Sequence, residues 1–155
     1  MGSTSVDRGG GWVAGQVVLG AVVLVLGAVG PRWPGAEGPL AVVGWALIVA
    51  GLAMLVVGGG VLGSSLTPFP RPSSTSSLRE DGIYGFVRHP MYGGTIVLFT
   101  GYALVTRPLA LVGTSVLALF LDRKSRREER WLVERYPGYA AYRRRTRWKF
   151  VPGIR

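Results

Sequence analysis

The sequence predicts an all-α fold, a polytopic membrane helical bundle of about four transmembrane helices with a cytoplasmic C-terminal helical segment. Composition is the first observation behind this prediction: 48% of the 155 residues are hydrophobic and only 17% are charged, whereas soluble domains average about 25% charged residues. The second is charge segregation, because this apolar chain still carries a formal net charge of +10. The third is a series of uncharged apolar runs, separated by polar or proline-containing segments.

The basic residues gather at the C-terminal end. Residues 122–155 carry twelve Lys and Arg against four acids, whereas residues 1–62 carry only two basic side chains. An apolar body with a basic end is typical of a membrane protein with a cytoplasmic tail. Membrane lipids are therefore the expected partner of the tail. Nucleic acid is the alternative, but it does not suit the apolar body, and we expect no nucleic acid.

The N-terminal part of the chain divides into a tail and two apolar runs. Residues 1–11 are polar and glycine-rich, which predicts a disordered N-terminus, and residues 12–62 predict two transmembrane helices. The runs 12–30 and 40–62 are long enough to cross about 30 Å of hydrocarbon at about 1.5 Å per residue. A cleaved signal peptide is the alternative for the first run. That run is long for a signal peptide, and no A-x-A site follows it.

Glycines mark one face of the second run. Gly44, Gly51 and Gly58 recur every seven residues and share a helix face. They predict close contact with a neighbouring helix, although ordinary glycine use in membrane helices is an equal alternative.

Residues 63–155 form the second half of the predicted bundle. A polar loop, residues 63–83, precedes two shorter apolar runs, 91–106 and 109–121, which Arg107 and Pro108 separate. Each run is short for a full span. Residues 84–89 can lengthen the first span. The second can continue past Asp122 as one helix, because no proline or glycine interrupts it before Pro137.

Four spans place both termini and the long loop on one side of the membrane. That side carries nearly all of the basic residues, whereas the other has only Arg32 and Arg107. The positive-inside rule therefore predicts an integral membrane protein with both termini and the active site in the cytoplasm.

The segment around residues 84–94 contains a candidate ligand site. Pro90 suits the first turn of a helix, so Arg88 and His89 lie beside free backbone N–H groups that favour an anion. Gly93 and Gly94, next to Tyr92, permit close approach to the backbone. The alternative is a basic interfacial anchor before a membrane helix.

Glu128 and Glu129 are unexpected acids in a basic stretch. Either can serve a ligand's ammonium group, or they can simply pair with neighbouring basic residues, as Glu128 would with Lys124 at i, i−4. Glu128 shares a stripe that could face the bundle, with Leu121, Ser125, Leu132 and Tyr136.

Two tyrosines follow the predicted end of the long helix. Tyr139 and Tyr142 lie one turn apart after Pro137 and Gly138. They can line a site or form an interfacial aromatic belt.

In this order, these elements resemble the isoprenylcysteine carboxyl methyltransferase family, to which phospholipid N-methyltransferases are distantly related. The resemblance covers about residues 66–153. It rests on Tyr84-x-x-x-Arg88-His89-Pro90-x-Tyr92-x-Gly94, Glu128-Glu129-x-x-Leu132, Tyr139-x-x-Tyr142 and Val151-Pro152. The chain departs from the family in having Ile83 where proline is frequent, and in lacking the early spans that help to form the prenyl-substrate pocket.

The resemblance implies a methyltransferase-like catalytic region at residues 63–155 that uses S-adenosylmethionine without a metal. The methyl group would pass to a lipophilic or small acceptor, with a carboxylate as the favoured acceptor group. Arg88 would hold that anion, and Glu128 or Glu129 would face the cofactor's amino group. The implied cofactor-binding set is Tyr84, His89, Tyr92, Gly93, Gly94, Glu128, Glu129, Tyr139 and Tyr142.

Two other functions are compatible with the sequence. One is an NADPH-dependent membrane reductase of the sterol type, for which the basic tail would suit a 2′-phosphate. The other is a non-enzymatic membrane adaptor whose tail binds lipid or a partner. Cofactor binding separates the three.

Overall fold

The computed structural model describes residues 9–34, 37–70 and 77–153. Within these ranges the regular secondary structure is helical, which confirms the predicted all-α class. The helices are α1 (Gly10–Ala28), α2 (Glu37–Leu62), α3 (Pro90–Val105), α4 (Leu109–Arg135) and α5 (Tyr139–Arg145), with short 3-10 turns at Gly63–Ser65 and Gly82–Gly85.

Most helix boundaries agree with the sequence prediction. α2 ends at Leu62, Arg107 and Pro108 separate α3 from α4, and α4 continues without a break to Arg135. Two differences are informative. α1 begins at Gly10, inside the segment 1–11 predicted to be disordered, and the rest of that segment, up to residue 8, lies outside the described residues. α3 begins at Pro90 and does not extend over residues 84–89, because those residues form a separate turn and an extended segment.

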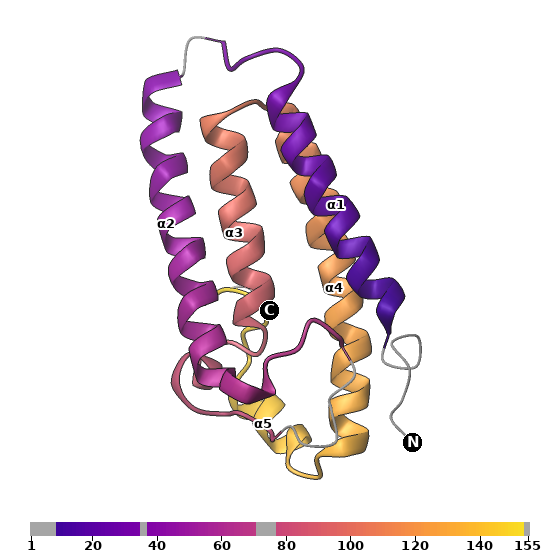
Figure 1. Ribbon diagram of the computed structural model, residues 1–155. Coiled ribbons are helices and arrows are strands. Elements are labelled where there is room, and N and C mark those ends of the chain that lie inside the picture. The colour runs from indigo at the N-terminus through magenta and orange to yellow at the C-terminus, as the bar shows by residue number, and fades with distance from the viewer. Residues whose placement is uncertain (1–8, 35–36, 71–76, 154–155) are drawn as a thin grey trace.

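The long helices pack in pairs (Figure 1). α1 lies along α4, α2 lies along α3, and α3 and α4 meet in the middle of the bundle. The buried core is formed where α1, α3 and α4 come together, by Val23, Ala103, Ala110, Leu117 and Leu121.

The contact of α2 with α3 depends on facing glycines. A Cβ on Gly44 would lie 2.8 Å from the Gly101 carbonyl oxygen, and a Cβ on Gly51 would lie 2.7 Å from that of Gly94. Gly58, one heptad further, faces Pro90 and Met91. This confirms the predicted close helix contact, because the missing side chains let the two backbones approach.

The outer surfaces of the bundle are apolar. Large side chains such as Val42, Val49 and Val56 on α2 are 64–73% exposed. Gly10–Ala28 and Gly38–Ser65 are long and apolar enough to cross a membrane, and only 11% of the apolar window of each is buried. α3 is a shorter apolar helix of 16 residues. Two candidate spans are therefore found in the described residues, where the sequence predicted four.

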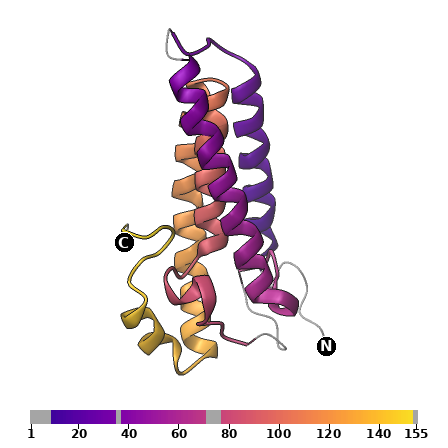
Figure 2. The ribbon, with the colours of Figure 1, turned by 90° about the vertical axis from the view of Figure 1, so that its left-hand side faces the viewer.

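The polar segments collect at one end of the bundle (Figures 1 and 2). The start of α1, the end of α2, the start of α3 and the end of α4 all lie there, together with α5. The chain after α5 returns along the bundle, where a bridge pairs Val87 with Trp148. The Arg88 and His89 amides donate to the carbonyl oxygens of Trp148 (3.1 Å) and Lys149 (2.8 Å).

Candidate functional site

The candidate site lies where α3 begins and α4 leaves its apolar half. The 82–89 segment, α4 and the returning C-terminal segment each contribute charged or aromatic side chains to it. Pro90 is the first residue of α3, as predicted, and His89 directly precedes the helix. The N-terminus of α3 thus fixes where the two preceding side chains project.

Arg88 connects α4 with the C-terminal segment. Its Nε donates to Glu129 Oε1 at 2.9 Å, and its Nη1 donates to the carbonyl oxygens of Thr146 and Arg147, each at 2.8 Å. Only 8% of its side chain is exposed. The sequence predicted that Arg88 binds the anionic group of the methyl acceptor. In the structure, such an acceptor would compete with Glu129 for this guanidinium.

Glu129 is the buried partner of several basic groups. Its carboxylate lies 2.9 Å from Arg88 Nε and 3.1 Å from His89 Nε2, while Arg143 Nε lies 3.5 Å from the other oxygen. Burial alone would raise the pKa of the Glu129 carboxyl, but the hydrogen bonds and charges of His89 and Arg88 outweigh it and lower the pKa to about 2. Glu129 is therefore ionised and held by the protein itself.

Glu128 points toward Tyr92 and the cavities beside it. Its Oε2 accepts a 2.7 Å hydrogen bond from the Tyr92 hydroxyl and lies 3.9 Å from His89 Nδ1. A quarter of its side chain is exposed, and that side chain lines two adjoining cavities. The alternative i, i−4 ion pair with Lys124 does not form within 4.0 Å in the described structure, because Lys124 turns toward Gln16 instead.

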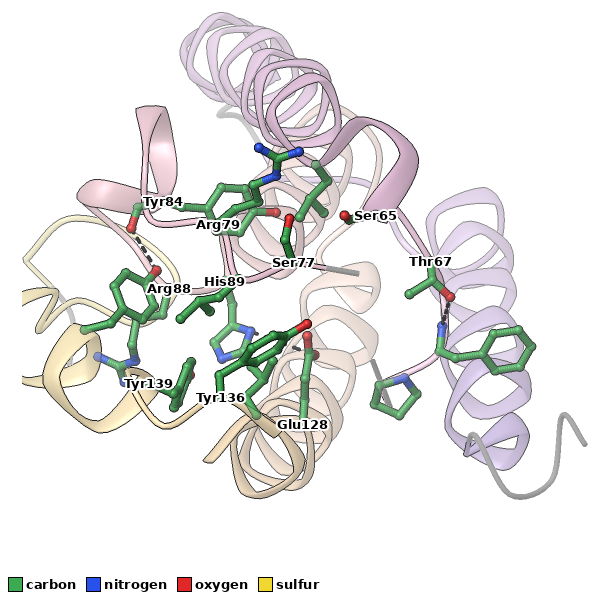
Figure 3. A pocket seen from close by; sticks show the side chains of 16 residues that line it. Ser65, Thr67, Ser77, Arg79, Tyr84, Arg88, His89, Glu128, Tyr136 and Tyr139 are labelled. Carbon is green, nitrogen blue, oxygen red and sulfur yellow. Dashed lines mark hydrogen bonds and ion pairs between the residues drawn. The ribbon is translucent and has the colours of Figure 1, made fainter. Parts of the chain in front are cut away.

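The first cavity, which we call the tyrosine cavity, encloses about 650 Å³ including its open mouth. Figure 3 shows His89 and Glu128 beside Tyr136, with Arg79, Ser77 and Ser65 across from them. Its aromatic wall is formed by Tyr84, Tyr136, Tyr139 and Tyr142.

Three of the predicted site tyrosines, Tyr84, Tyr139 and Tyr142, belong to this wall and are buried. Tyr139 and Tyr142 are 1% and 3% exposed, with ring centroids 5.6 Å apart, so they line a cavity and do not form an exposed aromatic belt. The Tyr142 hydroxyl donates to the Tyr84 carbonyl oxygen at 2.8 Å. Burial raises the pKa of the Tyr84, Tyr139 and Tyr142 phenols, so all three stay protonated at neutral pH.

Two buried polar atoms of the tyrosine cavity lack a partner in the described structure. They are the Tyr139 hydroxyl and Arg79 Nε. Buried polar groups are nearly always hydrogen-bonded, so these atoms beside the cavity are available to bind water or a ligand.

Gly93 and Gly94 allow close approach of backbone, but the backbone belongs to the protein. A Cβ on Gly93 would clash with the Phe150 carbonyl oxygen, and one on Gly94 would lie 2.9 Å from that of Gly51. The sequence predicted a ligand at both positions. In the structure these glycines seat the C-terminal segment and α2 against α3.

The second cavity, which we call the inter-helix cavity, shares Tyr84, Arg88, His89 and Glu128 with the first. It encloses about 940 Å³ including its open mouth. Its remaining lining comes from α1, α3, α4 and the segment after α2, and includes Gln16, Met91, Tyr92, Thr95 and Lys124.

Several site residues were missed by the sequence interpretation. Arg79 and Tyr136 line the tyrosine cavity, and Arg143 contacts Glu129. Arg143 lies within a run of basic residues that looked like a lipid-binding surface, and Arg79 lies in a loop without periodicity. A usable signal existed for Tyr136 alone, because it shares the helix stripe of Glu128.

Comparison with known protein families identifies the family of this chain. The family model described as phospholipid methyltransferase matches residues 40–138, which is more than half of the chain. The matched region contains most of α2, all of α3 and α4, and the residues of the Arg88, His89, Glu128 and Glu129 cluster. No curated protein matches the chain. The length of the family match shows that this chain belongs to the phospholipid methyltransferase family.

Proposed function

We propose that this protein is an integral membrane methyltransferase that transfers a methyl group from S-adenosylmethionine to a lipophilic acceptor, with a carboxylate as the favoured acceptor group. One observation carries the proposal. In a chain of the phospholipid methyltransferase family, a partly exposed carboxylate, Glu128, lines a tyrosine-walled cavity at the polar end of an apolar helix bundle.

The chemistry of the tyrosine cavity suits this cofactor. The amino-acid part of S-adenosylmethionine is a zwitterion, and the cavity offers the Glu128 carboxylate for its ammonium and Arg79 for its carboxylate. The adenosine part needs an aromatic surface and polar partners. The tyrosine wall supplies the surface, and the Tyr139 hydroxyl, which finds no partner among the described residues, supplies a donor.

Glu128 is the better of the two glutamates for the cofactor. Glu129 is already surrounded by Arg88, His89 and Arg143, so a further cation there would meet three basic groups. Glu128 makes one strong hydrogen bond, from Tyr92, and presents its carboxylate to both cavities. We therefore assign the ammonium to Glu128, and we assign to Glu129 the task of fixing Arg88 and His89.

Arg88, His89 and Tyr92 are positioning residues in this proposal. Arg88 fastens the C-terminal segment to α4, so it holds Tyr139 and Tyr142 over the cavity. The His89 ring, 4% exposed, separates the two glutamates and stacks on Tyr92 with centroids 5.5 Å apart. Tyr92 in turn fixes the orientation of Glu128.

The reaction requires the protein mainly to position the reactants. When bound, S-adenosylmethionine supplies an electrophilic methyl group on a sulfonium that is already a good leaving group. A carboxylate acceptor is ionised at pH 7 and needs no general base. The protein contributes a fixed approach geometry and a site partly shielded from water, which are the usual sources of rate in such displacements.

The exposed apolar faces support placement of the bundle in a bilayer. α1 and α2 expose large aliphatic side chains along their length, which a soluble protein would bury. We propose that α3 and the apolar first half of α4 complete four spans. The basic C-terminal segment then puts the site on the cytoplasmic face, where S-adenosylmethionine is available.

A radiolabel assay tests the function. Membranes containing the expressed chain are incubated with S-adenosylmethionine labelled in its methyl group, and the lipid extract is counted. We expect extractable label that S-adenosylhomocysteine suppresses and that Glu128→Gln reduces at least tenfold. Label no greater than in membranes carrying Glu128→Gln would contradict a lipophilic acceptor.

A further inference from the structure

The inter-helix cavity lies beside the cofactor site and contains an unusual cation. Glu128 and His89 belong to the wall that it shares with the tyrosine cavity. The lining is mainly apolar, with Leu62, Leu66 and Met91 among its residues, and it also includes the polar side chains of Gln16, Thr67 and Thr95. Lys124 reaches into the cavity from α4 and contacts Gln16 of α1.

Lys124 is a buried ammonium whose direct partners are neutral. The residue is 1% exposed. Its Nζ donates to Gln16 Oε1 at 2.6 Å and to the Pro68 carbonyl oxygen at 3.2 Å, and it lies 5.2 Å from the centroid of the Tyr92 ring. Among the described residues, no carboxylate oxygen lies within 4.0 Å of it, and the Glu128 carboxylate acts on it electrostatically from farther away.

A buried cation with neutral partners favours an incoming anion. Removing a charge from water costs several kcal/mol, and proteins normally compensate it with an opposite charge. Arg88 also lines this cavity, but its Nε already donates to Glu129 and its Nη1 to two backbone carbonyl oxygens. Lys124 is therefore the cation of this cavity that lacks an ion-pair partner in the described structure.

Resting on the proposed function, we infer that Lys124 and Gln16 bind the oxyanion of an amphiphilic acceptor, a carboxylate or a phosphate, and so make the reaction specific for anionic acceptors. The apolar lining accommodates the chain of such a molecule. The shared wall at Glu128 and His89 brings its head next to the cofactor site.

For a carboxylate acceptor, the same contact favours release of the product. One carboxylate oxygen forms a bond to the methyl carbon, the bond from that carbon to sulfur breaks, and its electron pair stays on sulfur. The acceptor becomes a neutral ester and loses its attraction to Lys124. For an acceptor whose anion is a phosphate, the negative charge persists and the product stays attracted.

Binding of defined lipids to the full chain in neutral detergent tests the inference, with bound lipid counted by native mass spectrometry. The probes are oleate, dioleoyl phosphatidic acid and oleyl alcohol. We expect Lys124→Gln to weaken binding of oleate, of phosphatidic acid or of both about tenfold, and to change oleyl alcohol by less than about twofold. The anion that responds identifies the acceptor group. Arg123→Gln removes a charge from the neighbouring exposed position and should change none of the three.

A second variant keeps the test decisive if Lys124→Gln does not fold. Gln16→Glu places a carboxylate against Nζ, so it satisfies the ammonium internally. We expect it to raise the unfolding temperature and to weaken anion binding about tenfold. Anion binding unchanged in both variants, or equal losses for oleyl alcohol, would overturn the inference. S-adenosylhomocysteine binding, measured on the same samples, should be retained, and its absence from the wild-type chain would instead refute the proposed function.

Discussion

At the scale of single residues, the adjacent glutamates have different environments and different tasks. Glu129 is buried and surrounded by Arg88, His89 and Arg143, whereas Glu128 contacts Tyr92 and lines both cavities. Neighbouring residues on a helix point about 100° apart, so one side chain can serve the fold while the next serves a ligand. The sequence identified both residues, but it could not choose between them, because the choice depends on how residues 84–89 and 143–149 fold against α4.

The lowered pKa of Glu129 predicts loss of stability in acid. Its pKa lies at about 2 in the folded protein, below its usual value near 4.5, so the folded state binds this proton more weakly than the unfolded chain. The stabilisation is fully present above about pH 4.5 and is lost as pH falls toward 2. Thermal unfolding in detergent between pH 7 and pH 3 should show this fall, and Glu129→Gln should flatten it.

Glu129→Gln should also lower the unfolding temperature at pH 7, because it leaves the buried Arg88 guanidinium without its counterion, a loss that typically costs about 3–5 kcal/mol. Glu134→Gln, at an exposed position of the same helix, is the matched control. If both variants unfold alike at every pH, Glu129 does not have the structural task that we assign to it.

Tyr92→Phe tests the orientation of Glu128 without changing any charge. Loss of a hydrogen bond to a charged group typically costs about 1.5–3 kcal/mol, and here the loss frees the carboxylate to rotate away from the ligand. We expect S-adenosylhomocysteine to bind at least tenfold more weakly by calorimetry, and the unfolding temperature to fall moderately because of the lost hydrogen bond. Unchanged affinity would show that Glu128 acts without Tyr92 or does not contact the cofactor.

At the scale of helices and segments, glycines decide which elements touch. Gly44 and Gly51 let α2 pack closely on α3, and Gly93 lets the Phe150 carbonyl of the C-terminal segment pack against α3. The heptad spacing in α2 made the first contact predictable. The second was not, because a lone glycine near a ligand motif can equally face a ligand or a backbone, and the returning segment has no periodicity.

Gly51→Ala should separate α2 from α3. Its Cβ would lie 2.6–2.8 Å from backbone atoms of α3, where nothing flexible can yield. Gly60→Ala, in the same helix with open space around its Cβ, should instead leave the protein as stable or gain about 1 kcal/mol in helix propensity. Unfolding temperatures of the two variants measure the difference. Equal values would mean that the glycine face does not form the contact.

At the scale of the whole molecule, the bundle gathers its charges and its site at one end. α1 and α2 are long and apolar. α4 extends past its apolar half and carries Glu128 and Glu129 at this end. Composition and charge segregation sufficed to predict an all-helical apolar bundle, and the motif order predicted the family. The inter-helix cavity was not predictable, because Gln16 and Lys124 meet only after α1 packs on α4.

The proposed orientation can be tested with single cysteines, since the chain has none of its own. Gly138→Cys marks the site end, and Arg32→Cys marks the opposite end; both positions are exposed. In spheroplasts of an expressing bacterium, a membrane-impermeant maleimide should label Arg32→Cys, and should label Gly138→Cys only after lysis. The reverse pattern would place the site outside the cytoplasm.

Calorimetric titration of the purified chain with S-adenosylmethionine and S-adenosylhomocysteine tests the central claim most directly, with NADPH as the contrasting ligand. We predict saturable binding of both sulfur nucleosides, at least tenfold weaker binding to Glu128→Gln, and unchanged binding to Glu134→Gln. NADPH should give no saturable heat. Folded protein that binds neither sulfur nucleoside, or that binds them equally well after Glu128→Gln, would contradict the site described above.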